Sequence, residues 1–200
     1  AGPHIAADAD IVIDAQARSS PEILTVGSEI GVGYARSDAS ATVTLHNNAT
    51  LLADGNVILS SNTDNTVDAL IKTNSLFNKN KVFKKVSVSA DIAVGVTEAY
   101  SHAATLIGQG SAITAGGDVS VFSVNTKSLD TVVKVGSTTG QIGAAVAVTL
   151  SEATSRAEIS GMVTAGGDIF AIAQTISAKN ATEADSRIGN SFFSQVTKSL

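Results

Sequence analysis

Three histidines, His4, His46 and His102, are the residues of this sequence best suited to bind a metal or transfer a proton at neutral pH. They lie far apart, and no pair has the short spacing by which ligands bind zinc. Serine, histidine and aspartate all occur, but the Gly-x-Ser-x-Gly pattern of a nucleophile elbow does not. A Gly-rich phosphate loop ending in lysine is also missing. We therefore expect no catalytic residue, no metal site and no cofactor.

Carbohydrate chemistry is the main enzymatic alternative. Enzymes that cleave sugars need clustered carboxylates, together with aromatic platforms. Here aspartate and glutamate are spread singly along the chain. Phe122 and Phe170 are candidates to hold a sugar ring, because the alternation that points Val121 inward points them outward. An equally good explanation of the two outward-facing phenylalanine rings is that a neighbouring loop or chain covers them.

A basic and partly aromatic segment interrupts an otherwise acidic sequence. It lies within residues 72–85, and a basic loop on an acidic body is suited to an anionic polymer or a partner protein. The simpler interpretation is a solvated loop whose lysines discourage pairing of strand edges. The candidate binding residues are Lys79, Lys81, Phe83, Lys84 and Lys85, with Phe77 beside them.

Glycine followed by aspartate or asparagine recurs before segments of alternating hydrophobicity. We expect these sites to be turns, in which glycine supplies a positive φ and the Asx side chain accepts nearby backbone N–H groups. Calcium binding is the alternative, because Gly-Gly-x-Gly-x-Asp repeats bind calcium in β-rolls, but their nine-residue period is absent. The predicted turn residues are Gly55, Asn56, Gly116, Gly117, Asp118, Gly166, Gly167 and Asp168.

The turns mark a repeat along the chain. Their Asx positions are Asp10, Asn56, Asp118 and Asp168, and the middle interval is longer than the interval on either side of it. Two coils of about 23–25 residues would fill each of the shorter intervals, and that length is typical of stacked repeat proteins. The longer interval then contains an insertion, which we assign to residues 72–85.

Strands are the elements that fit this repeat. Residues after each turn alternate with period two, so the first inward-facing column is expected to be Ile11, Val57, Val119 and Ile169. The second column would be Ile13, Leu59, Val121 and Ala171. A further element begins at Ile30, Ile92 and Ile142, which precede their following Asx turns by the same interval.

Composition supports thin apolar layers and excludes several classes of function. The chain is 44% hydrophobic but only 4% aromatic, so small β-branched residues must fill its interior. A net charge of −5 gives no general attraction to nucleic acid. There is no cysteine, and no apolar run is long enough for a membrane span. The first residues do not read as a signal peptide, and we expect a fragment of a longer protein.

Two segments resemble the repeats of giant bacterial exported proteins. These segments are Ala157–Ile169 and Ile142–Val148, and the resemblance extends diffusely over residues 5–175. The families are the filamentous adhesins, the haemagglutinin-like exoproteins and the leukotoxin-like filamentous adhesins. The resemblance implies a right-handed parallel β-helix that is exported through an outer membrane and displayed outside the cell. It transfers no functional residue.

The sequence therefore predicts an all-β chain forming a right-handed parallel β-helix (β-solenoid), with residues 1–200 as one segment of a longer array. We expect a non-enzymatic structural or adhesive stalk at the cell surface. Its expected partners are further repeats of the same chain, and surface glycans or proteins, but not nucleic acid. The alternative is a carbohydrate-binding or carbohydrate-cleaving β-helix protein, including the tailspike-like ones. A segment of a phage fibre is less consistent with the sequence, because trimerisation signals are absent from it.

Overall fold

Strands make up the regular structure of the part of the chain that the computed structural model describes, which is residues 2–27, 30–74, 90–136 and 142–186. No helix occurs among these residues. The strands are β1 (His4–Ala7), β2 (Ile11–Ser19), β3 (Glu22–Gly27), β4 (Ile30–Leu45), β5 (Thr50–Ala53), β6 (Val57–Asn74), β7 (Ala90–Ile107), β8 (Ala112–Ala115), β9 (Val119–Gly136), β10 (Ile142–Ile159), β11 (Met162–Ala165) and β12 (Ile169–Ser186).

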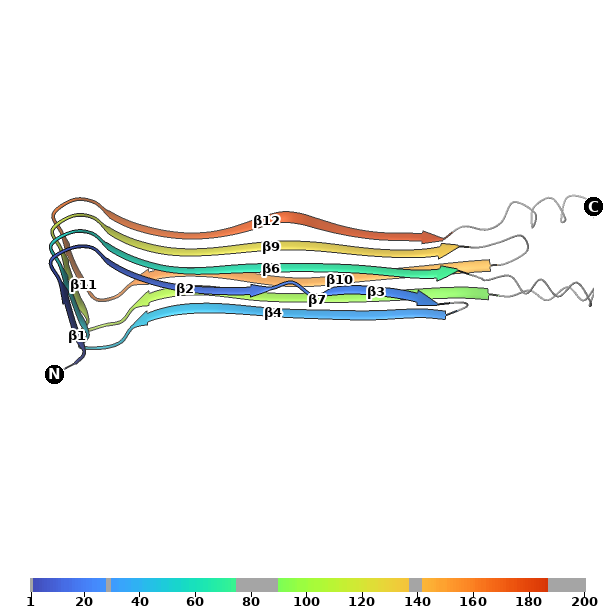
Figure 1. The fold of residues 1–200 in the computed structure, drawn as a ribbon, viewed down its shortest axis with the longest axis horizontal. Coiled ribbons are helices and arrows are strands. Elements are labelled where there is room, and N and C mark those ends of the chain that lie inside the picture. Colours follow the sequence, from blue (N-terminus) through green and yellow to red (C-terminus); the bar gives the residue numbers. More distant parts are fainter. Residues whose placement is uncertain (1, 28–29, 75–89, 137–141, 187–200) are drawn as a thin grey trace, which may run out of the picture.

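Three parallel sheets contain all of these strands (Figure 1). A short sheet has the order β1-β5-β8-β11. The first long sheet has the order β12-β9-β6-β2, and β3 also pairs with β6. The second long sheet has the order β10-β7-β4. Every pairing in the three sheets is parallel, and the all-β prediction is confirmed.

The chain visits the three sheets in the same order each time. We call one passage a layer, and the layers are His4–Leu45, Thr50–Ile107, Ala112–Ile159 and Met162–Ser186. The first three layers pair with one another in the short sheet and in both long sheets, and layers three and four pair in the short sheet and the first long sheet. The described part of layer four contains only β11 and β12.

The predicted coil length is wrong, because one layer occupies the whole interval between successive Asx turns and not half of it. Along the short sheet, His4 pairs with Thr50, Thr50 with Ala112, and Ala112 with Met162. The two halves of one interval do not stack on each other, because their long strands, such as β6 and β7, belong to different sheets. One layer therefore takes about twice the predicted length of chain.

The predicted alignment of the element that begins at Ile142 is also wrong. Ile30 pairs with Ile92, as the equal spacing suggested, but Ile142 pairs with Ala90 instead of Ile92. The connection after β10 is residues 160–161, whereas the connection after β7 is residues 108–111. Because the connection after β10 is shorter, the pairing between β10 and β7 is shifted by an even number of residues. An even shift leaves the inward and outward faces of the strands unchanged.

Alternation along the long strands builds the interior. Ile11, Val57 and Val119 are buried, as predicted for the first column. Ile169 occupies the same column but is 50% exposed, because no described layer covers layer four. Leu59 and Val121 of the second column are buried too.

Two apolar clusters fill the interior and a polar band separates them. The first cluster lies beside the short sheet and includes Leu59, Ile113 and Val119. The second lies toward the other end of the long strands and includes Ile71 and Val133. The band between them consists of buried serine, threonine and asparagine side chains.

Two asparagines connect the long sheets through this band. Asn65 of β6 donates from Nδ2 to the carbonyl oxygen of Tyr100 at 2.8 Å. Asn125 of β9 donates to the carbonyl oxygens of Ser101 and Thr154 at 3.0 and 3.1 Å. Its Oδ1 accepts from the Ser101 hydroxyl at 2.7 Å. Buried polar groups cost little stability when they are paired in this way.

The predicted Asx turns form a continuous hydrogen-bonded ladder at the corner between the short sheet and the first long sheet. Asp10 Oδ1 accepts from the N–H of Asn56 at 2.6 Å. Asn56 Oδ1 accepts from the N–H of Asp118, and Asp118 Oδ1 from the N–H of Asp168, both at 2.8 Å. The side chains of Asp10, Asn56 and Asp118 thus each bind the layer that follows.

Glycine is required at this corner for a reason other than the predicted one. The only described glycine with a positive φ is Gly110, at 78°. A Cβ on Gly117 would overlap Asn56 Oδ1, and a Cβ on Gly167 would overlap Asp118 Oδ1. Glycine is needed because the next layer approaches the ladder too closely for any side chain.

Candidate functional site

The two phenylalanines predicted to face outward lie on the first long sheet. Phe170 is 42% exposed and Phe122 is half-buried. Phe122 pairs with Ile172, whereas Phe170 pairs with Ser120, so the rings belong to neighbouring columns. They extend an apolar strip at the layer-four end and have no charged residue directly beside them in register.

The predicted basic segment falls mostly outside the described residues. β6 continues to Asn74, so Lys72 belongs to a strand of the first long sheet. The remaining candidates lie within residues 75–89, outside the part of the chain that is described. These candidates are Phe77, Lys79, Lys81, Phe83, Lys84 and Lys85.

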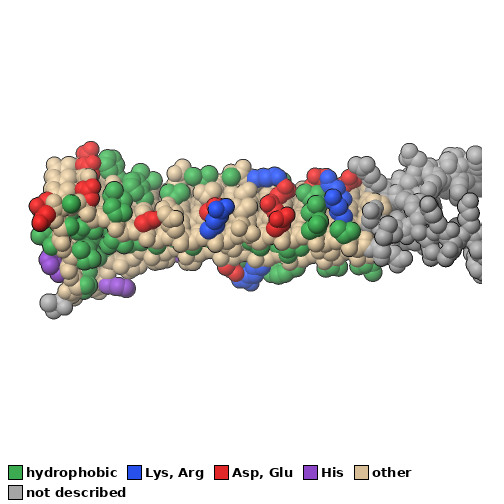
Figure 2. All heavy atoms as spheres, viewed as in Figure 1, with side chains coloured by type: hydrophobic (Ala, Val, Ile, Leu, Met, Phe, Trp, Pro, Cys, Tyr) green, Lys and Arg blue, Asp and Glu red, His purple; other side chains and the backbone are tan. Residues whose placement is uncertain are grey.

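Charged side chains on the first long sheet form isolated ion pairs. The Arg18–Asp64 pair is 3.4 Å long and the Lys134–Glu183 pair is 3.3 Å long, and both are exposed. Figure 2 shows acidic side chains at the left end of the visible face, and acidic and basic side chains together farther to the right. Exposed pairs of this kind add little stability.

Carboxylates do stack in one column of this sheet. Glu22, Asp68 and Asp130 occupy successive layers in register. Lys179 of layer four donates a hydrogen bond to Asp130. This hydrogen bond and the charges of Asp130 and Asp68 raise the pKa of Lys179, although partial desolvation acts in the opposite direction. No group of three or more histidine, aspartate or glutamate side chains among the described residues is arranged to hold a metal.

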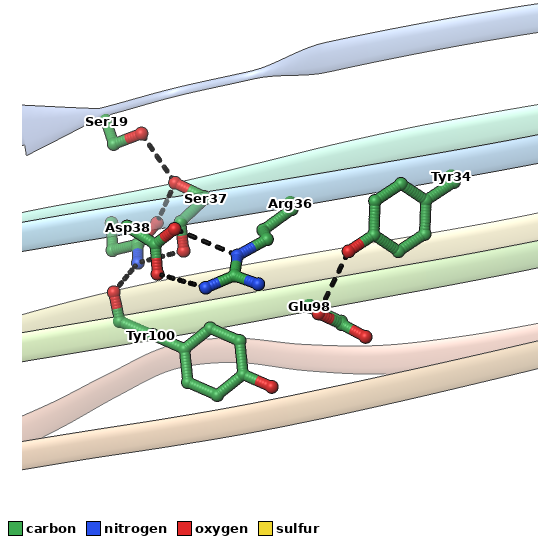
Figure 3. Close-up of polar contacts among 8 residues, drawn as sticks. Ser19, Tyr34, Arg36, Ser37, Asp38, Glu98 and Tyr100 are labelled. Atoms are coloured by element: carbon green, nitrogen blue, oxygen red, sulfur yellow. Dashed lines mark hydrogen bonds and ion pairs between the residues drawn. The ribbon is translucent and has the colours of Figure 1, made fainter.

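The outer face of the second long sheet carries a row of interacting polar and aromatic side chains (Figure 3). The Tyr34 hydroxyl donates to Glu98 at 3.0 Å. Arg36 binds Asp38 through Nε at 2.9 Å, and its guanidinium lies 5.0 Å from the centre of the Tyr100 ring. Strands β4 and β7 supply these residues from adjacent layers.

Electrostatics in this row follow from those contacts. The hydrogen bond to Glu98 raises the pKa of Tyr34 above its ordinary value, with partial desolvation and the charge of Glu98 acting in the same direction. The hydrogen bond and charge of Asp38 raise the pKa of Arg36, which therefore stays protonated. Further along the face, hydrogen bonds from Ser160 and Arg156 lower the pKa of Glu158.

A groove of about 360 Å³ adjoins this row and crosses three layers. Asp38, Tyr100 and Glu152 are in register across β4, β7 and β10. Beside them, Ser40, His102 and Thr154 form the next outward column, and His102 Nδ1 lies 2.6 Å from Thr154 Oγ1. The groove is lined by Asp38, Ala39, Ser40, Tyr100, Ser101, His102, Glu152 and Thr154.

These groups suit binding better than acid–base chemistry. Asp38 and Glu152 are two layers apart, so their backbones are about 9–10 Å apart. Asp38 is already paired with Arg36. The groove therefore combines one aromatic ring with hydrogen-bonding groups on both sides of it.

Sequence reasoning missed the groove. In the sequence His102 is one of three scattered histidines, and no motif distinguishes Tyr100. The signal that joins Asp38, Tyr100 and Glu152 is their equivalent position in three successive layers. Because the intervals between them are unequal, this signal has meaning only once the layer register is known.

An apolar patch lies next to the groove on the same face. Its inward neighbours include Gly31, Gly33 and Gly95, because the two long sheets approach closely there: a Cβ on Gly95 would lie 2.6 Å from Val133 Cγ2. Large aliphatic side chains consequently point outward. The patch consists of Ile30, Val32, Tyr34, Ile92, Val146, Val148 and Leu150, which are 40–67% exposed.

Comparison with protein family models, with curated proteins and with solved structures finds no match to this chain. Within the described ranges, no helix has the length and apolarity needed to cross a membrane.

Proposed function

We propose that this chain is a section of a right-handed parallel β-solenoid that forms the stalk of a large secreted or cell-surface protein. Its role is structural and adhesive: it spaces and displays binding surfaces away from the cell. The observation that carries the proposal is the parallel register of all three sheets. A chain that advances by one layer with each passage can be lengthened without a change in its cross-section.

Exposed apolar residues of layer four, which no described layer covers, support further repeats of the same chain as the first partner. In layer four, Met162 and Ile169 are 69% and 50% exposed, although Ile169 lies in an inward column. The corner ladder also ends there, because no described N–H group is bound to the Asp168 carboxylate. A following layer with glycine at its corner would cover the apolar residues and extend the ladder.

The outer faces support display. They carry isolated ion pairs, and the second long sheet adds the apolar patch and the shallow groove beside it. The proposed location is extracellular, and the proposed external partners are surface glycans or proteins. The competing function, cleavage of a polysaccharide, would need the carboxylates of the groove to act together.

Antibody labelling and attachment assays test this function together. An antibody raised against this chain should label intact cells of the source organism without permeabilisation. Beads coated with the chain should attach to cells or to glycan-coated surfaces, and the soluble chain should release no reducing sugar from polysaccharides. Labelling only after permeabilisation would contradict the stalk, and release of reducing sugar would favour the enzyme.

A further inference from the structure

We propose that the groove on the second long sheet is a binding site for a neutral glycan, with Tyr100 as its aromatic platform. The site is formed by the outward columns of three layers, so it exists only in the folded stack. Its volume of about 360 Å³ is within the range of small-ligand sites. This inference deepens the adhesive part of the proposed function, and rests on it, by naming the class of ligand.

Tyr100 is held in place before any ligand arrives. Arg36 lies over its ring at 5.0 Å, and Asp38 holds Arg36 through a charged hydrogen bond of 2.9 Å. From the interior, Asn65 binds the backbone carbonyl of Tyr100 at 2.8 Å. A residue that is held at its backbone by Asn65 and packed at its ring against Arg36 loses little conformational entropy when a ligand binds.

The hydrogen-bonding groups around the ring match the hydroxyls of a sugar. The carboxylates of Asp38 and Glu152 lie in the same column on either side of Tyr100 and accept hydrogen bonds. Ser40 and His102 lie in the adjacent column, and both line the groove. Since Nδ1 of His102 is engaged with Thr154, its Nε2 remains to contact a ligand.

Charge decides which glycans fit. The groove is lined by two carboxylates, and Arg36 beside it is already paired with Asp38. Sulfated, sialylated or uronic-acid glycans would place like charge beside Glu152. Neutral sugars meet no such penalty. This preference is opposite to the one expected of the lysine-rich segment at residues 72–85.

Binding of defined oligosaccharides to the purified chain tests the inference. The probes are linear hexasaccharides of glucose, mannose, galactose and N-acetylglucosamine, with sulfated and sialylated oligosaccharides for comparison, measured by calorimetry. At least one neutral probe should bind, and no anionic probe should bind more tightly. Tyr100→Ala should weaken binding about tenfold or more, whereas Tyr100→Phe, which keeps the ring, should retain most of it.

Tyr34→Ala is the matched control, because Tyr34 is an exposed tyrosine on the same face but does not line the groove. Its affinity should stay within about twofold of the parent. If Tyr100→Ala does not fold, Glu152→Ala replaces it as the test variant and should weaken binding of the neutral probe about fivefold. The inference is overturned if no neutral probe binds at millimolar concentration, if anionic probes bind best, or if Tyr34→Ala weakens binding as much as the groove variant does. The stalk is tested separately by surface labelling.

Discussion

Single hydrogen bonds at the corner join successive layers, and others on the outer face hold its polar side chains in place. Asp10, Asn56 and Asp118 each bind the backbone of the following layer. Asparagine serves as well as aspartate at this site, so the acceptor oxygen matters more than the charge. The ladder therefore has a structural role, which is to join successive layers.

Asp118→Ala should lower the free energy of unfolding by about 1 kcal/mol, because it leaves the N–H of Asp168 without its acceptor. Asp118→Asn should preserve stability, since Asn56 performs the same role one layer earlier. Urea denaturation followed by circular dichroism measures both. Asp168→Ala is the control and should have almost no effect; a loss as large as that of Asp118→Ala would disprove the ladder's direction.

Tyr34 should titrate above the ordinary range of tyrosine in a spectrophotometric titration, because Glu98 accepts its proton in a hydrogen bond and so raises the pKa of Tyr34. Glu98→Gln should lower the pKa of Tyr34. A raised folded pKa means that the contribution to stability is complete below the unfolded pKa and is lost as the pH rises through the folded one. An unchanged titration in Glu98→Gln would show that the hydrogen bond is not the cause.

The long strands bury residues of different size at their two ends. Toward the short sheet, the long strands bury valine and leucine, such as Val57 and Leu59. Toward the other end, the second long sheet turns glycine and alanine inward and exposes its larger residues, because β4 and β7 approach the side chains of Ile71 and Val133. A strand can thus alternate perfectly and still point its larger apolar residues to solvent.

Gly95→Val should destabilise the fold by about 3 kcal/mol, because its side chain would meet Val133 and Ile71 at close range. Val146→Ser, on the outward face of β10, should change stability by less than about 0.5 kcal/mol. Thermal and urea unfolding of the two variants provide the comparison. Equal effects would mean that the inward and outward faces of the second long sheet have been exchanged.

Val119→Asp should be far more harmful than Ile169→Asp, although both residues occupy one column. Val119 is fully buried, so an unpaired carboxylate there costs several kcal/mol, whereas Ile169 is half exposed in layer four. The soluble yield and the urea midpoint report the difference. If Ile169→Asp unfolds the chain equally, layer four is covered in solution.

Much of this element-level structure was predictable from residue types. Alternation identified the strands after each Asx turn and assigned Val57, Val119, Leu59 and Val121 to the interior. The layer length was not predictable, because β6 and β7 are equally long and a repeat cannot show whether they stack or face each other. The groove depends on pairing between residues that lie a whole layer apart in the sequence.

The whole molecule is an assembly of layers whose properties come from repetition. Contacts between adjacent layers provide the core, the corner ladder and the outward columns. Groups that lie far apart in the sequence, such as Asp38 and Glu152, share a surface only because the layers are in register. Both proposals, the stalk and the glycan groove, depend on this register.

Engineered disulfides between layers test the register most directly, because the chain has no cysteine of its own. Asn62, Val124 and Gln174 are outward residues of one column in layers two, three and four. Adjacent layers place Cα atoms about 4.8 Å apart, within the range of a disulfide, while two layers place them about 9–10 Å apart. The cysteine pairs 62/124 and 124/174 should therefore oxidise readily and leave folding intact, and the pair 62/174 should not form in the monomer. Failure of 62/124, or efficient formation of 62/174, measured by mass spectrometry, would contradict a stack with one layer for each passage through the three sheets.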